Sequence, residues 1–171
     1  MSEKKISSNN IGIAGEFYMA HILAKNNFKV NVSLGRTEGF DLFVQNPHGF
    51  NMTISVKTTY LKRNKFILMN KKAETLIDES LFYAFVRLNM PDGVPEFWIV
   101  PSTVVAKVIM DSYKIWIKET AKDGSAHNET PMRGFYLIPR ENFPDDWQEQ
   151  LDFFKGNVRM LEEWNEVKIE D

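Results

Sequence analysis

The sequence predicts an α/β fold, and three observations support this prediction. Helical and strand-like hydrophobic patterns follow one another along the 171 residues, hydrophobic residues make up 43% of the chain, and no repeat or linker divides it. A chain of this length can bury most of its apolar surface around one core. We therefore expect one domain over residues 1–171, with an acidic helical region over about residues 141–171.

The first predicted element is a helix that runs to about Asn26. Asn9 and Asn10 can cap its first turn, because their side chains accept hydrogen bonds from exposed backbone N–H groups. Four apolar residues recur at helical spacing and predict the buried stripe, namely Ile13, Phe17, Ala20 and Ala24. Glu16 falls on the edge of this stripe. A carboxylate there needs a partner, because burying an unpaired charge is costly or raises its pKa.

A strand over residues 28–33 and a β-hairpin follow. The hairpin strands are predicted over residues 40–45 and 50–59, because residues 46–49 read Asn-Pro-His-Gly. This tetrapeptide suits a type I turn, with Asn at the first position, Pro at the second and Gly at the fourth.

The turn also predicts the register of the hairpin. With Gly49 in the left-handed conformation of a three-residue loop, Asn46 pairs with Phe50 and paired residue numbers sum to about 96. Asp41 then lies opposite Ser55. Because side chains alternate along a strand, Ser55 and Lys57 share one face.

The rest of the chain predicts further strands and helices. The expected strands cover residues 65–69, 81–88, 97–100 and 135–138. The expected helices cover residues 71–77, residues 102 to about 117 with Ser102 as the cap, and residues 147–164 with a break at Gly156. We expect Trp147, Leu151, Phe154 and Leu161 to pack on the sheet, and Arg133 to have a structural role rather than a phosphate-binding one.

Composition excludes several classes of site. The chain has no cysteine, so disulfides and thiolate chemistry are excluded, and its three histidines are widely separated, which disfavours a histidine-rich zinc site. No apolar run approaches the roughly 18–20 residues of a membrane span, and residues 1–10 are polar. We therefore expect a cytoplasmic protein without a membrane partner.

Charge is unevenly distributed along the chain, although the formal net charge is only -2. Residues 42–73 contain no Asp or Glu, whereas residues 141–171 contain ten. The acid-free segment predicts contacts with nucleic-acid phosphates through its cations beyond Lys57, which are Lys62, Arg63, Lys65, Lys71 and Lys72. An ordinary solvated surface is the alternative for the same residues.

Three short motifs resemble the PD-(D/E)XK restriction-endonuclease-like superfamily. They are Gly15-Glu16 on the first helix, Gly39-Phe40-Asp41-Leu42 on the first hairpin strand and Val56-Lys57-Thr58 on the second. The order is similar to that of archaeal Holliday-junction resolvases and small prokaryotic endonuclease-like proteins. The resemblance implies a restriction-endonuclease-like fold, with a central mixed β-sheet flanked by helices.

The resemblance also implies a site and a reaction. Asp41 would be the main ligand of Mg²⁺ or Mn²⁺, Glu16 a second acid, and Lys57 the catalytic lysine. A hard cation of this kind prefers oxygen ligands and activates water for phosphodiester hydrolysis. DNA is the expected partner, and a homodimer is expected because many members of the superfamily work as dimers.

Ser55 departs from the family pattern, because it stands where the superfamily normally has Asp or Glu. A hydroxyl is a weaker Mg²⁺ ligand than a carboxylate, unless Glu16 or Glu38 compensates. Two functions therefore stay open: a metal-dependent nuclease acting on DNA phosphodiesters, with Ser55 as a third metal ligand, or a catalytically silent nuclease-fold domain that binds nucleic acid or a protein. A third is an interaction protein that uses its acidic C-terminal helix.

Each site residue also has an ordinary structural explanation. Glu16 could pair with Lys25 or Arg36, Asp41 could cap its glycine-rich turn, and Lys57 could be a solvated sheet lysine. It is their joint order on a helix and a hairpin that favours the functional interpretation.

Overall fold

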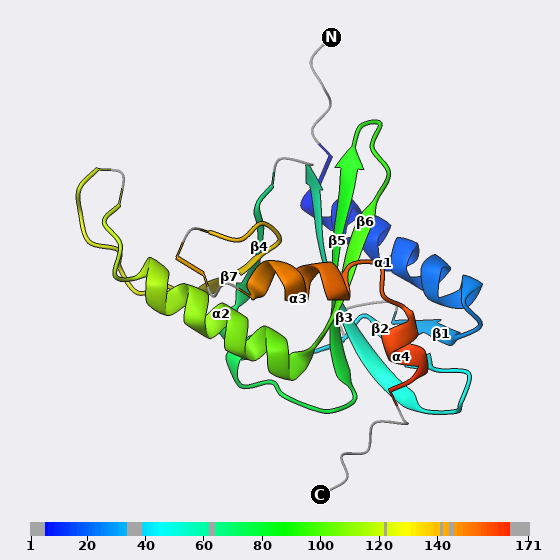
Figure 1. The fold of residues 1–171 in the computed structure, drawn as a ribbon. Helices are drawn as coiled ribbons and strands as arrows, with labels where there is room; N and C mark the ends of the chain where they lie inside the picture. The colour runs from blue at the N-terminus through cyan, green and yellow to red at the C-terminus, as the bar shows by residue number, and fades with distance from the viewer. Residues whose placement is uncertain are drawn as a thin grey trace, which may run out of the picture.

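The structure, a computed structural model, describes residues 6–33, 39–61, 64–121, 123–140, 142–143 and 146–164 (Figure 1). Four α-helices, one 3₁₀-helix and seven strands lie in these residues. In chain order they are α1 (Ser8–Lys25), β1 (Lys29–Val32), β2 (Leu42–Gln45), β3 (Asn51–Leu61), β4 (Phe66–Asn70), η1 (Lys71–Glu74), β5 (Leu81–Met90), β6 (Glu96–Pro101), α2 (Ser102–Trp116), β7 (Met132–Tyr136), α3 (Trp147–Phe154) and α4 (Arg159–Glu162).

A five-stranded mixed sheet forms the centre of the molecule, in the order β1-β2-β3-β5-β6. The β3–β5 pair is parallel, and the other neighbouring pairs are antiparallel. The β4 and β7 strands form a separate antiparallel ribbon, in which Phe66 pairs with Tyr136 and Asn70 pairs with Met132. This architecture confirms the predicted α/β class with a central mixed sheet flanked by helices.

Helices cover both faces of the sheet. Along β5, Phe82, Ala84 and Val86 join the core beneath α1, whereas Tyr83 and Phe85 join the core beneath α2 and α3 (Figure 1). Strand β5 is buried along almost its whole length, as expected for a strand whose two faces both pack on helices. The sheet therefore has an α1 face and an α2–α3 face.

The first helix corrects two sequence predictions. Its cap is Ser7, whose hydroxyl accepts from the backbone N–H of Asn10, so Asn9 and Asn10 lie inside the helix. Its buried stripe is Ile11, Gly15, Met19 and Leu23. The predicted stripe is wrong in its orientation, because Ile13 and Ala24 are exposed and Phe17 is 54% exposed. The helix carries two apolar stripes, and the buried one is harder to recognise in the sequence because one of its positions is a glycine, Gly15.

The hairpin confirms the predicted register. The backbone N–H of Asn46 donates to the Phe50 carbonyl at 2.9 Å, and Gly49 has a φ of 88°. Further along, Leu42 pairs with Ile54, which continues the sum of 96. The Asn46 carboxamide also accepts from the backbone N–H groups of His48 and Phe50, which stabilises the turn.

Other boundaries differ from the predicted ones. The predicted helix over residues 71–77 is limited to the 3₁₀ turn η1. Ser102 does not cap α2, because Pro101 occupies the cap position and the Ser102 hydroxyl donates to the Asp78 carbonyl instead. The break predicted at Gly156 is confirmed, because α3 and α4 lie on either side of this glycine, whose φ is 65°. The four residues expected on its packed face, Trp147, Leu151, Phe154 and Leu161, are buried as predicted.

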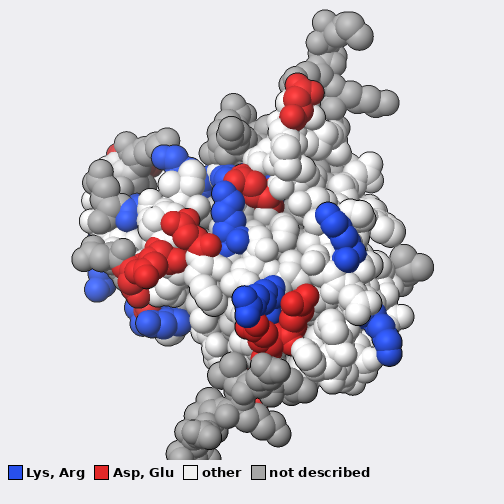
Figure 2. Space-filling model, turned by 45° about the vertical axis from the view of Figure 1, so that its right-hand side comes forward, with Lys and Arg blue, Asp and Glu red and all other residues white. Residues whose placement is uncertain are grey.

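Surface charge and helix hydropathy add two facts. On the face that Figure 2 shows, basic and acidic side chains are interspersed with wide uncharged areas, so no patch of one sign dominates it. Within the described part of the chain, no helix is both long enough and apolar enough to cross a membrane.

Candidate active site

The candidate site lies where β2 and β3 separate. Past the Leu42–Ile54 pair, the backbone N–H of Asp41 still donates to the Ile54 carbonyl at 2.9 Å, and the Asp41 side chain then bonds the next part of β3. Asp41 Oδ2 accepts a 2.6 Å hydrogen bond from the backbone N–H of Val56 and a 3.5 Å one from Ser55 Oγ. The carboxylate therefore takes the position that a backbone carbonyl would hold in a continuing ladder. Among the described residues, the Asp41 carboxylate therefore bonds β3 and not the glycine-rich turn that it was considered to cap.

Lys57 and Ser55 extend this hydrogen-bonded chain. Lys57 Nζ donates to Ser55 Oγ at 2.9 Å, and the two side chains lie on the same face of β3, as alternation predicts. Ser55 is only 4% exposed, whereas Asp41 and Lys57 are half-buried. The buried Ser55 hydroxyl therefore links Lys57 to Asp41, while these two charged side chains remain partly exposed to solvent.

Helix α1 carries Glu16, whose pKa responds to the charges of this group. Its neighbour Gly15 packs so closely on Thr58 of β3 that an added Cβ would lie 2.8 Å from Thr58 Cγ2 and 2.9 Å from Thr58 Cβ. Burial raises the pKa of Glu16, the negative charge of Asp41 raises it further, and the positive charge of Lys57 opposes the rise. Glu16 is thus within Coulombic range of both predicted partners.

Of the two ion pairs considered for Glu16, only the one with Lys25 lies within the described residues, and it is not formed. Glu16 and Lys25 make no salt bridge, and Arg36 and Glu38 lie outside the described residues. The structure therefore joins Asp41, Ser55 and Lys57 by hydrogen bonds, and it places Glu16 near enough for the charges of Asp41 and Lys57 to act on its pKa.

The side-chain atoms that the candidate site offers to a metal ion are of the type that a hard cation prefers. Asp41, Glu16 and Ser55 offer only oxygen atoms, which Mg²⁺ and Mn²⁺ prefer. Asp41 Oδ1 has no hydrogen-bond partner among the described residues, which leaves it available to a cation. Over the same residues, no group of three or more His, Cys, Asp or Glu side chains is placed to hold a metal ion. A cation here would complete its shell with water or phosphate oxygens, as Mg²⁺ commonly does.

The predicted phosphate-binding cations are only partly placed. Lys65, Lys71 and Lys72 are exposed, whereas Lys62 and Arg63 lie outside the described residues. A groove of about 590 Å³ lies between Thr58 and Thr59 of β3 and residues 64–68 at the start of β4. Asn64 donates to the Thr59 hydroxyl, which ties the beginning of β4 to the strand that carries Lys57.

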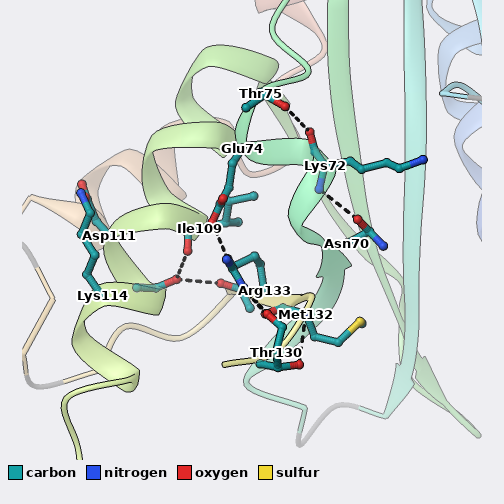
Figure 3. Close-up of polar contacts among 12 residues, drawn as sticks. Asn70, Lys72, Glu74, Thr75, Ile109, Asp111, Lys114, Thr130, Met132 and Arg133 are labelled. Atoms are coloured by element: carbon teal, nitrogen blue, oxygen red, sulfur yellow. Dashed lines mark hydrogen bonds and ion pairs between the residues drawn. The ribbon is translucent and has the colours of Figure 1, made fainter. Parts of the chain in front are cut away.

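Arg133 has the predicted structural role. Figure 3 shows it reaching from β7 to Glu74 on η1, and it also donates to the carbonyls of Thr130 at 2.7 Å and Met132 at 2.9 Å. Its guanidinium stacks 3.5 Å from the centre of the Tyr113 ring. Arg133 is buried, so it is not available to phosphate, and its acidic partner is Glu74 rather than the C-terminal region.

Sequence reasoning missed two contributors to this site. The backbone N–H of Val56 fixes the Asp41 carboxylate, and no side-chain motif can reveal it. Gly15 allows α1 to approach β3. A glycine inside a predicted helix, next to Glu16, was the signal for this contact, because glycine in a helix interior is unfavourable without a packing reason.

Comparisons with known proteins support the fold of this chain and nothing finer. No protein-family profile matches the sequence, and no curated protein matches it. Among solved structures, that of a bacterial homing endonuclease is similar, with a TM-score of 0.53 and 12% sequence identity over 93% of this chain and 94% of that one. At this identity the likeness shows a shared fold only. The chain therefore has a nuclease-like fold.

Proposed function

We propose that this protein is a metal-dependent nuclease of the PD-(D/E)XK type that hydrolyses DNA phosphodiesters. The observation that carries the proposal is the convergence of Asp41, Lys57 and Glu16 where β2 and β3 separate. Ionisable groups with a perturbed pKa that lie near one another in a partly exposed position mark a candidate functional site. The nuclease-like fold supports the same interpretation.

Each residue has a distinct role in this proposal. Asp41, held by the Val56 N–H, would present Oδ1 to Mg²⁺ or Mn²⁺. Such an ion, when bound, would polarise a phosphoryl oxygen of the substrate and lower the pKa of a bound water. Lys57 would stabilise negative charge on the phosphate during attack, because a fixed ammonium in a partly buried position interacts strongly with developing charge. Glu16, when ionised, would orient the attacking water and accept its proton.

The test compares cleavage of linear and branched DNA by wild type, Asp41→Asn and Asp41→Ala in Mg²⁺ or Mn²⁺. Asparagine keeps an oxygen that can accept from the Val56 N–H but removes the charge, so it separates the metal-binding role from the strand-fixing role. Asp152→Ala is the matched control, because Asp152 is an exposed helical aspartate on α3. We expect cleavage by wild type and the control, its loss in both Asp41 variants, and its loss in EDTA. Cleavage that survives in Asp41→Asn would refute the proposed mechanism.

A specific observation favours a second candidate, a catalytically silent domain that binds nucleic acid. Lys57 already donates to Ser55, and the described residues offer no cluster of three metal-binding side chains. This candidate predicts DNA binding that weakens with salt, as for any contact made by Lys and Arg with phosphates, and no turnover in any divalent cation. Metal-dependent and Asp41-dependent cleavage would exclude it.

A further inference from the structure

Among the residues that the structure describes, the outer face of the β4–β7 ribbon is an exposed apolar surface. Residues 67, 69, 133 and 135 point into the core, so the alternate residues of both strands face outward. Phe66 is 42% exposed and Leu68 is 56% exposed, and Met132 and Ile138 are exposed beside them. A contiguous exposed group of large apolar side chains marks an interaction surface more often than a chance arrangement.

Two aromatic rings lie next to each other on this surface. Phe66 and Tyr136 are register partners whose ring centroids lie 5.2 Å apart. Gly134 has no side chain, and a Cβ there would lie 2.9 Å from the Tyr136 ring, so the ring rests on the ribbon over this glycine. The Tyr136 ring is tilted by 38° to the Phe66 ring and also contacts Phe143 and Arg140, so Phe66 and Leu68 are the side chains of this face most open to a stacking base.

Lysines flank the surface at both ends of β4. Lys65 precedes Phe66, and Lys71 and Lys72 follow Asn70, all three exposed. Figure 3 shows the Lys72 side chain directed away from the Glu74–Arg133 pair. The strands themselves contain no acidic residue, and the charge of their one arginine is matched by Glu74. A second copy of this chain would bring like charges together on such a face, whereas a nucleic acid brings phosphates to the lysines and bases to the rings.

A groove connects the surface to the part of β3 that follows Lys57. The groove of about 590 Å³ is lined by Phe66 and Leu68 on its β4 side and by Thr58 and Thr59 on its β3 side. Thr58 directly follows Lys57, and Thr59 shares the Lys57 face of β3. A strand whose phosphate lies at Lys57 can therefore follow the groove to the ribbon.

We propose that the outer face of the β4–β7 ribbon binds single-stranded or unpaired DNA, stacking bases on Phe66, Tyr136 and Leu68 while Lys65, Lys71 and Lys72 contact the backbone. Paired bases stack on each other and hide their faces inside the duplex, so only unpaired nucleotides can use such a surface. This inference rests on the proposed function, because it names the form of DNA that the site receives.

The test measures binding of fluorescent single-stranded and duplex oligonucleotides in EDTA, by anisotropy, in the Asp41→Asn background. Without cleavage, binding is measured alone, so failure of the nuclease proposal and failure of this inference give different results. We expect tighter binding of single strands than of duplex. Phe66→Ala with Leu68→Ala should weaken single-strand binding by about tenfold or more, the scale of one lost base–aromatic stack. Phe153→Ala is the control, because Phe153 is 58% exposed and belongs to α3, not to either strand of the ribbon.

Two more variants make the result specific. Gly134→Ala should weaken single-strand binding because it displaces the Tyr136 ring, and Lys71→Ala with Lys72→Ala should reduce its salt dependence. Thermal unfolding confirms that each variant is folded. Unchanged single-strand affinity in the Phe66–Leu68 variant would overturn the inference, and so would preferential duplex binding or no binding at all. A lower sedimentation coefficient of that variant with unchanged DNA affinity would assign the face to a second copy instead.

Discussion

Gly15→Ala should separate α1 from β3, and its effect can be worked out from the contact with Thr58. A methyl group at residue 15 would overlap Thr58 Oγ1 and lie 2.8 Å from Cγ2 and 2.9 Å from Cβ. Rotation of the Thr58 side chain cannot move its Cβ, so the helix has to shift. The helical propensity of alanine contributes about 1 kcal/mol of stability, whereas overpacking costs about 1–3 kcal/mol. We expect the free energy of unfolding to change by about 0 to -2 kcal/mol.

Gly12→Ala is the matched control in the same helix. No atom lies within 4 Å of a Cβ built at residue 12, so this variant should gain roughly 0.5–1 kcal/mol from propensity alone. Urea denaturation monitored by circular dichroism measures both variants. Adding Thr58→Ala removes two of the three closest atoms and should recover part of the Gly15→Ala loss, with a coupling energy of about 0.5–3 kcal/mol. If Gly15→Ala is as stable as Gly12→Ala, α1 is not held against β3 by this contact, and the placement of Glu16 loses its basis.

The remaining predictions concern charged groups. Burial alone would raise the pKa of Glu96, but hydrogen bonds from Lys155, Asn89 and Arg87 outweigh it and lower the pKa to about 2. The lowered pKa contributes up to about 3 kcal/mol to the free energy of unfolding above the pKa of Glu96 in the unfolded chain, and this contribution is lost as pH falls from about 4.5 to 2. Urea midpoints measured across this range should show the loss, and the pH dependence should disappear in Glu96→Gln. Because the pKa of Glu16 is raised, the acidic limb of any cleavage–pH profile should lie above the usual carboxylate range and disappear in Glu16→Gln; a limb at the ordinary position would argue against Glu16 as the base. Ser55→Asp should lower the Mg²⁺ concentration for half-maximal cleavage by roughly 10- to 100-fold and enlarge the Mg²⁺-induced rise in Tm; no change in either would show that residue 55 does not face the cation.

The sequence was most informative where local chemistry determines geometry. The Asn-Pro-His-Gly turn determines the register of β2 and β3, and alternation along β3 then places Ser55 and Lys57 on one face. The convergence of Asp41 with Lys57 was therefore predictable from about twenty residues. The break at Gly156 was predictable for the same reason, since a glycine with positive φ ends a helix locally.

Tertiary contacts decided the features that sequence could not predict. The first helix offers Ile13 and Phe17 on one face and Ile11, Met19 and Leu23 on another, and only the fit of Gly15 against Thr58 determines which face is buried. The pairing of β4 with β7 joins segments more than sixty residues apart, and no turn signal reports it. Both outcomes depend on packing between distant segments, where intrinsic propensity is a weak guide.

The distant partner of β4 has a consequence for the order of assembly during synthesis. Residues 66–70 leave the ribosome long before residues 132–136, and β5, β6 and α2 are complete in the interval. Until β7 arrives, the inward side chains of β4, Ile67 and Met69, have no strand beside them, and Glu74 lacks the guanidinium of Arg133. A nascent chain that stalls before residue 132 therefore exposes an unpaired hydrophobic strand edge, the kind of surface that chaperones bind and that drives aggregation.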